Sequence, residues 1–62
     1  MSESIVSAIY RFTSKKIPFV IEYFPKTDLV FTASAKDLDG VNRSAGSNDL
    51  IITLDKLFEL VR

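Results

Sequence analysis

The sequence predicts a small α+β domain with an N-terminal helix, an antiparallel β-hairpin and a C-terminal helix, and a third short strand as an option. Apolar residues recur at helical spacing near both ends of the chain. A run rich in β-branched and aromatic residues fills the middle, and Pro18 separates it from the first helix because proline is excluded from helix interiors. We expect residues 1–62 to form a single domain.

A first helix is expected over residues 2–15. Its apolar residues fall along one side at helical spacing, with Ala8 beside them: Ile5, Val6, Ile9 and Phe12. Ser2 or Ser4 can cap the start of the helix. Basic residues near its end suit the negative pole of the helix dipole: Arg11, Lys15 and Lys16.

A β-hairpin is expected from two strands, residues 17–24 and 29–35, joined by a turn at 25–28. The apolar sets of the two strands share a face only if the numbers of opposed residues sum to an even value. We therefore predict a loop of three or five residues around Pro25. Phe24 directly opposite Leu29 would contradict this register.

The segment 36–49 is expected to be a long polar loop. It contains both glycines of the chain and many Asp, Asn and Ser residues. Loops of this length in small domains are usually functional or disordered. Asp37 and Asp39 resemble the alternating ligands of a calcium loop, but the glycine and the final glutamate of an EF-hand are misplaced, so a solvated turn is favoured.

The C-terminal residues support two interpretations, both of which end in a helix. In the first, one helix starts near Ser47 or Asn48 and its apolar residues form one stripe: Leu50, Leu54, Leu57, Phe58 and Val61. In the second, residues 50–52 form a third strand and Thr53 caps a shorter helix. The second is favoured because adjacent Ile51 and Ile52 suit a buried strand.

The expected core combines apolar residues of both helices and both strands: Ile5, Ile9, Phe12, Phe19, Ile21, Phe31, Leu54, Leu57 and Phe58. A chain of this length lies at the lower edge of what folds unaided. It has no cysteine for a disulfide and no histidine for a metal, so self-association is the remaining common way to enlarge the core. We expect a homodimer or a larger complex.

The composition argues against catalytic activity. Catalysis at neutral pH most often uses histidine or a perturbed cysteine, and the chain has neither. We expect no catalytic residues, no cofactor and no metal site. No apolar run is long enough to cross a membrane and no secretion signal is visible, so a cytoplasmic location is expected.

Two weaker patterns point to charged ligands. Small residues at 44–48 precede a helix, a setting that can bind an anion, but the lysine of a P-loop is missing. Four basic residues together with Tyr10 and Tyr23 could bind nucleic acid: Arg11, Lys15, Lys16 and Lys36. The formal net charge of zero argues against that use, because most nucleic-acid binding relies on a broad basic surface.

The hairpin's second face carries more apolar surface than an exposed sheet face requires. Val20, Phe24 and Val30 lie on it. Either the C-terminal helix covers this face, or it binds another molecule, with an unpaired strand edge extending the contact. In the second case Val20, Phe24 and Val30 are the expected contacts, with Tyr23 and Arg43 as secondary candidates.

The expected function is that of a non-enzymatic protein–protein interaction module. It would act as a small dimeric regulator or inhibitor that binds a larger protein partner. The alternatives are a small nucleic-acid-binding or transcription-regulating module, and a small structural subunit of an assembly. Small chains of this kind are common in phages and other mobile elements. An origin in such an element is an expectation from that frequency alone and rests on no motif.

Overall fold

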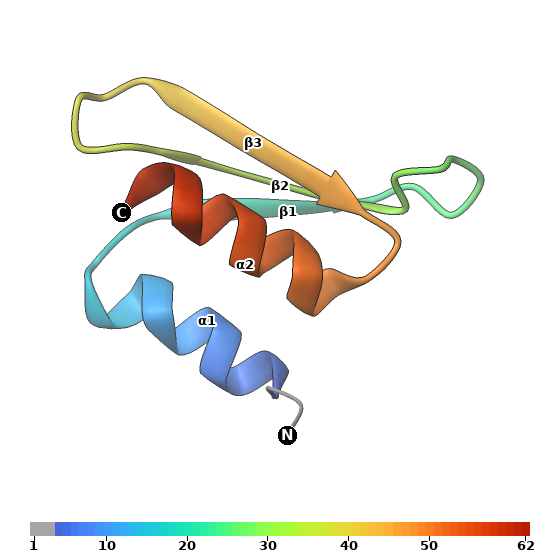
Figure 1. Ribbon diagram of the computed structural model, residues 1–62, viewed down its shortest axis with the longest axis horizontal. Helices are drawn as coiled ribbons and strands as arrows, with labels where there is room; N and C mark the ends of the chain where they lie inside the picture. The colour runs from blue at the N-terminus through green and yellow to red at the C-terminus, as the bar shows by residue number, and fades with distance from the viewer. Residues whose placement is uncertain (1–3) are drawn as a thin grey trace.

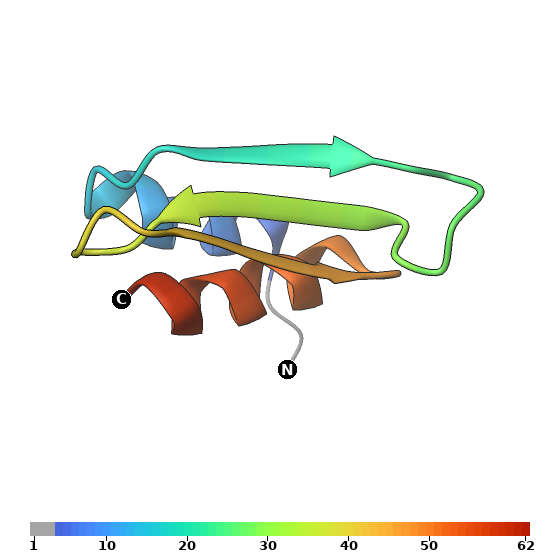
Figure 2. The ribbon, with the colours of Figure 1, turned by 90° about the horizontal axis from the view of Figure 1, so that it is seen from above.

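The computed structural model describes residues 4–62 and confirms the α+β class. The elements follow in the order α1 (Ile5–Ser14), β1 (Phe19–Tyr23), β2 (Phe31–Lys36), β3 (Asn42–Ser47) and α2 (Leu50–Val61). The strands form one antiparallel sheet in the order β1-β2-β3, and both helices lie on the same face of it (Figures 1 and 2). The molecule therefore has two layers, a helical layer and a sheet.

Helix α1 is closed at both ends by hydrogen bonds. The Ser7 N–H donates to Ser4 Oγ at 3.1 Å, so Ser4 is the N-cap. Ser2, the other expected cap, lies outside the described residues. At the C-terminus the N–H groups of Lys16 and Ile17 donate to the carbonyls of Thr13 and Phe12, at 3.1 and 2.9 Å. This Schellman arrangement holds Lys16 at a φ of +56°.

The β1–β2 register agrees with the prediction from the apolar pattern. Ile21 lies opposite Ala33, so opposed residue numbers sum to an even value. The Phe24 N–H donates to the Val30 carbonyl at 2.7 Å, which leaves residues 25–29 as a five-residue loop. The second strand begins at Phe31, later than expected, because Leu29 belongs to the loop.

Two expectations about the second half of the chain were wrong. The expected loop at 36–49 contains β3, which pairs with β2 along its whole length. The expected third strand at 50–52 is instead the first turn of α2, capped by Asp49, as in the single-helix interpretation. Ile51 and Ile52 favour strands only weakly by themselves, and the burial of α2 against the sheet decides their conformation.

The core lies between the helices and the sheet and combines large side chains with alanines. Its buried members are Ala8, Phe12, Ala33, Ala35, Leu54, Leu57 and Val61. Most other expected core residues pack against this cluster while partly buried: Ile5, Ile9, Phe19, Ile21 and Phe58. Phe31 is not part of the cluster and its ring lies beside Tyr23. The alanines of β2 let α2 pack close to the strands.

A small polar cluster joins β3 to α2. Thr53 is fully buried, and its Oγ1 lies 2.7 Å from Ser47 Oγ and donates to the Asp49 carbonyl at 2.8 Å. The Asp49 carboxylate accepts a hydrogen bond from the Ile52 N–H at 3.0 Å. These bonds satisfy polar groups at the start of the helix and explain why a threonine is tolerated in the core.

Candidate protein-binding surface

The sheet has one face without a helix, which we call the open face. Cross-strand pairing shows which side chains share it, because neighbours opposite each other in a sheet point to the same side. Along each strand, side chains of the open face alternate with side chains of the helix-covered face. The open face comprises Val20, Glu22, Phe24, Val30, Thr32, Ser34, Lys36, Asn42, Ser44 and Gly46.

Apolar side chains are exposed on the β1 side of the open face. Val20 is 59 % exposed and Phe24 is 42 % exposed, while Val30 is half-buried. Leu29, 54 % exposed, covers Gly46 from the hairpin loop, since a Cβ added to Gly46 would lie 3.3 Å from Leu29 Cδ1. A hollow of about 410 Å³ lies beside Val20 and Asn42 at one end of the sheet.

The interpretation in which the C-terminal helix covers this face is wrong. Helix α2 packs against the other face, where Ala33 and Ala35 are buried. The two helices and β1 share one core. Phe12 of α1 contacts Phe58 of α2 and Phe19 of β1, with ring centroids 5.4 and 4.9 Å apart. A helix moved to the open face would lose this shared core.

Tyr23, a secondary candidate, lies on the helix-covered side of the sheet. Its pairing partner is Phe31, and the two ring centroids are 5.4 Å apart. Tyr23 is nonetheless 62 % exposed because β1 ends there. It is therefore accessible at the sheet edge and does not extend the open face.

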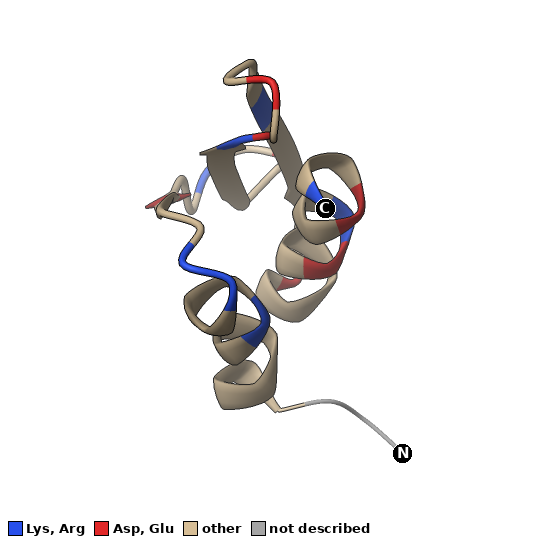
Figure 3. Cartoon of the chain, turned by 90° about the vertical axis from the view of Figure 1, so that its left-hand side faces the viewer, with Lys and Arg blue, Asp and Glu red and all other residues tan. Residues whose placement is uncertain are grey.

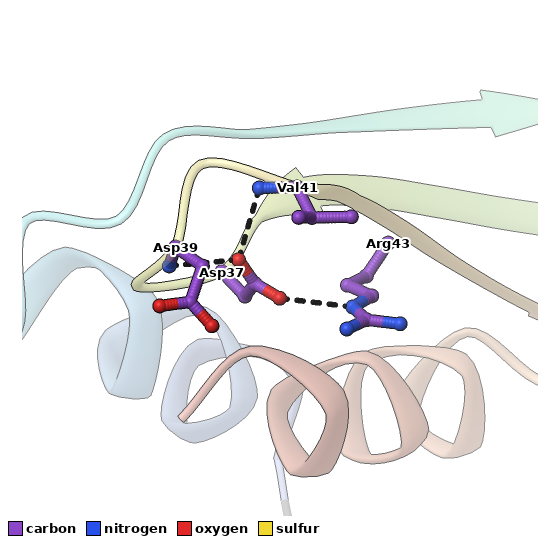
Figure 4. Close-up of polar contacts among 4 residues, drawn as sticks. All are labelled: Asp37, Asp39, Val41 and Arg43. Carbon is purple, nitrogen blue, oxygen red and sulfur yellow. Dashed lines mark hydrogen bonds and ion pairs between the residues drawn. The ribbon is translucent and has the colours of Figure 1, made fainter.

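Arg43, the other secondary candidate, lies in β3 just after the turn that follows β2 (Figure 4). It pairs with Ala35, so it lies on the helix-covered side of the sheet and not on the open face. One oxygen of the Asp37 carboxylate accepts the N–H groups of Asp39 and Val41 at 2.9 and 3.0 Å. The other oxygen accepts the Arg43 Nε–H at 2.9 Å. The Val41 N–H and then Arg43 lower the pKa of Asp37 below its ordinary value, against a smaller opposing effect of burial.

This turn is structural. Gly40 supplies a φ of +79°, which favours glycine, and Asp37 closes the loop on both sides of it. Within residues 4–62, no group of three or more acidic, histidine or cysteine side chains is placed to hold a metal. The Asp37–Asp39 pattern is therefore explained by backbone hydrogen bonds.

Two basic residues at the end of α1, Arg11 in the helix and Lys15 just after it, contact α2. Arg11 forms an ion pair with Asp55 at 2.7 Å. The Lys15 ammonium lies 5.6 Å from the centre of the Phe58 ring, within cation–π range. Figure 3 shows basic residues in the second half of α1 and just after it, and acidic residues on α2. These contacts account for two members of the expected basic patch within the fold.

Residues 44–48, the expected anion site, do not form an anion-binding loop. Residues up to Ser47 belong to β3, and the N-terminus of α2 is capped by the Asp49 carboxylate. A negative charge at that position opposes the binding of an anion. The segment has a capping role.

Sequence reasoning missed Leu29 and Gly46 as parts of the open face. Both lie in segments expected to have other roles, Leu29 in a strand and Gly46 in a loop, and only the pairing of β3 with β2 brings them together. The sequence carried one signal: the small residues Ala33 and Ala35, two positions apart, indicated that another element packs closely on the face of the sheet opposite the open face.

In the described part of the chain, neither helix has the length and hydrophobicity required to cross a bilayer. Comparison with known proteins found no matching family model, no matching curated protein and no matching solved structure.

Proposed function

We propose that this chain is a non-enzymatic protein-interaction module, a small dimeric regulator or inhibitor whose open face binds a larger protein partner. The observation that carries the proposal is the placement of both helices on one side of the sheet. It leaves Val20 and Phe24, and Leu29 over Gly46 of β3, exposed on the other side. Apolar clusters of this kind on a small sheet are typical of protein-binding surfaces.

The open face also indicates what the partner should present. Glu22 lies between Val20 and Phe24 along β1, and it is the one acidic side chain among the residues named above for the open face. Hydroxyl groups of Thr32, Ser34 and Ser44 line the centre of the sheet beside it. We expect a partner surface with apolar side chains opposite Val20 and Phe24 and a basic side chain opposite Glu22, because an interface matches apolar contact with complementary charge.

The test uses a photo-crosslinking amino acid at position 20, with position 38 as the matched control. Leu38 is 88 % exposed but lies on the β2–β3 turn, away from the open face. In cells that make this protein, we expect a discrete adduct with one larger protein from position 20 and none from position 38. An adduct between two copies of this chain is told apart by its mass. The adduct with the larger protein should be lost when Phe24→Glu is added.

The protein found in the adduct is then purified and its affinity measured by calorimetry. Phe24→Glu should weaken binding by about tenfold or more, as expected for a central apolar contact, whereas Leu38→Glu should leave it unchanged. Far-UV circular dichroism checks that both variants remain folded. Equal adducts from both positions, or equal affinities of the two variants, would reject the open face as the binding surface.

Salt dependence separates this proposal from the nucleic-acid alternative. Binding through an apolar face should change little with ionic strength. Binding of an oligonucleotide through basic residues should fall steeply as salt is added. Tight, salt-sensitive oligonucleotide binding would favour the alternative.

A further inference from the structure

The outer edge of β1 has unpaired backbone groups. Because Phe24 donates to Val30, and hydrogen-bonded pairs alternate along an antiparallel ladder, Val20 and Glu22 direct their backbone groups toward β2. The N–H and C=O groups of Phe19, Ile21 and Tyr23 therefore point away from the sheet. Among the residues that the structure describes, no other chain segment bonds to them, and Figure 2 shows β1 as an outermost strand.

Glu22 is the one charged side chain of this edge strand, which otherwise lacks the usual protection against pairing with another strand. Edge strands are commonly blunted by central lysines, prolines or bulges. β1 has the sequence Phe-Val-Ile-Glu-Tyr with no lysine or proline inside it. Pro18 precedes the strand, at a position whose backbone would face β2 and not the outer edge.

We propose that β1 pairs antiparallel with β1 of a second copy of this chain, joining the two sheets into one. The pairing is centred on Ile21, which lies opposite Ile21 of the second copy. Phe19 and Tyr23 then lie opposite each other twice, once on each side of the centre. Every outward-facing residue of β1 thus meets an outward-facing residue, as an antiparallel ladder requires.

The neighbouring registers are disfavoured by particular residues. A shift by two residues in one direction places Glu22 opposite Glu22 of the second copy and Phe19 opposite Pro25, which has no N–H. A shift in the other direction requires the Ile17 N–H, which already donates to the Phe12 carbonyl at 2.9 Å. Shifts by one residue oppose outward-facing and inward-facing backbone groups. The symmetric register is the one in which all groups are satisfied.

A second copy is the occupant that this edge fits best. The register is self-complementary, so a twofold axis repeats each contact, as in most homodimers. Phe19 and Tyr23 lie opposite each other across the axis, and aromatic cross-strand pairs stabilise sheets. Strands of five residues make a small contact, so we expect a reversible dimer whose population depends on concentration.

This inference rests on the dimeric part of the proposed function and leaves the open face available for the larger partner. It adds the location and register of the dimer contact. Because it depends on the backbone of β1 and not on the side chains of Phe24 or Leu29, its failure is distinguishable from failure of the open-face proposal.

The first experiment compares Tyr23→Pro with Tyr23→Thr by sedimentation and light scattering over a wide concentration range. Proline removes an N–H that points away from β2, so the fold should persist, as checked by circular dichroism. Two hydrogen bonds across the axis are lost, and dimerisation should weaken by about tenfold or more. Tyr23→Thr keeps the N–H and should remain largely dimeric.

The second experiment tests the register by disulfide formation between introduced cysteines. The chain has no cysteine of its own, so no other disulfide can form. In the proposed register Val20 lies opposite Glu22 of the second copy, in a non-hydrogen-bonded pair suited to a disulfide. An oxidised mixture of Val20→Cys and Glu22→Cys should therefore crosslink faster than either variant alone. Ser44→Cys, on the opposite edge strand, is the control and should not crosslink.

Each contrary outcome has a definite meaning. A wild-type chain that is monomeric at all concentrations would overturn the dimer. A dimer that survives Tyr23→Pro would overturn pairing through β1 while leaving protein binding by the open face in place. Fastest crosslinking by Glu22→Cys alone or by Val20→Cys alone would overturn the symmetric register in favour of one of its neighbours.

Discussion

Single residues at the ends of the helices determine where the elements stop. Lys16 adopts a φ of +56° so that the chain can leave α1 through a Schellman motif and enter β1. A left-handed conformation is unfavourable for residues with a Cβ, and glycine normally occupies this position. At the other end of the chain, the buried Thr53 hydroxyl depends on bonds to Ser47 and Asp49.

Replacement of Lys16 by glycine should stabilise the protein. Lys16→Gly removes the strain of the left-handed conformation, and we expect the free energy of unfolding to rise by about 0.5–1 kcal/mol. Lys16→Ala is the control, because it removes the same charge but keeps a Cβ. Urea denaturation measures both, and an equal gain in the alanine variant would attribute the effect to charge.

Replacement of Thr53 by valine should destabilise the protein although the shapes are similar. The variant removes the buried hydroxyl that lies 2.7 Å from Ser47 Oγ and donates to the Asp49 carbonyl at 2.8 Å, so both hydrogen bonds are lost and an apolar methyl group faces polar atoms. We expect the free energy of unfolding to fall by about 1–2 kcal/mol. Thr13→Val, on the exposed side of α1, should change it by less than about 0.5 kcal/mol. Similar losses in the two variants would show that helix propensity is responsible.

At the scale of elements, the β2–β3 hairpin depends on one carboxylate. Asp37 bonds to two backbone N–H groups and to Arg43, so β3 is anchored at its first residues despite a composition of small and polar side chains. The hairpin in turn provides the strand on which α2 packs. The Asp37 pKa is lowered by these bonds, which links the stability of the hairpin to pH.

The contribution of Asp37 should be lost in acid. The folded-state pKa lies below the ordinary value of 3.8, so the stabilisation is fully present above pH 3.8 and decreases as the pH falls through the folded-state pKa. The difference in unfolding free energy between the wild type and Asp37→Asn should therefore shrink below pH 3.8. Denaturation of the two proteins across this range is the measurement, and a difference that does not change with pH would contradict the link.

The whole molecule is a sheet with one covered and one open face. Its Cα atoms span 32 × 28 × 14 Å, as expected for a thin two-layer structure. Adjacent residues of β2 therefore have opposite environments: Ala33 is fully buried beneath α2, while Ser34 lies on the open face. This asymmetry is the basis of the proposed binding surface.

A pair of valine substitutions tests the asymmetry. Ala33→Val adds two methyl groups where α2 packs closely, and should lower the free energy of unfolding by about 1–3 kcal/mol. Ser34→Val adds similar volume on the open face, where valine suits a strand, and should be neutral or slightly stabilising. Thermal and urea denaturation provide the measurement. Equal losses at both positions would indicate that both faces are covered.

The sequence by itself determined the class of the fold, helix α1, the β1–β2 register and most of the large core residues. These features follow from local periodicity and from Pro18, which act over a few neighbouring residues. It also identified Val20, Phe24 and Val30 as one group, since period two places them on one face of the hairpin.

Only the tertiary structure decided the state of residues 42–52. β3 is formed from small polar residues because the edge of β2 offers hydrogen-bond partners and α2 covers it, and neither is visible in a local window. Ile51 and Ile52 are helical because the stripe through Leu54 and Leu57 is buried as a unit. The choice of one face for both helices, and with it the exposed surface, depends on contacts between residues far apart in the chain.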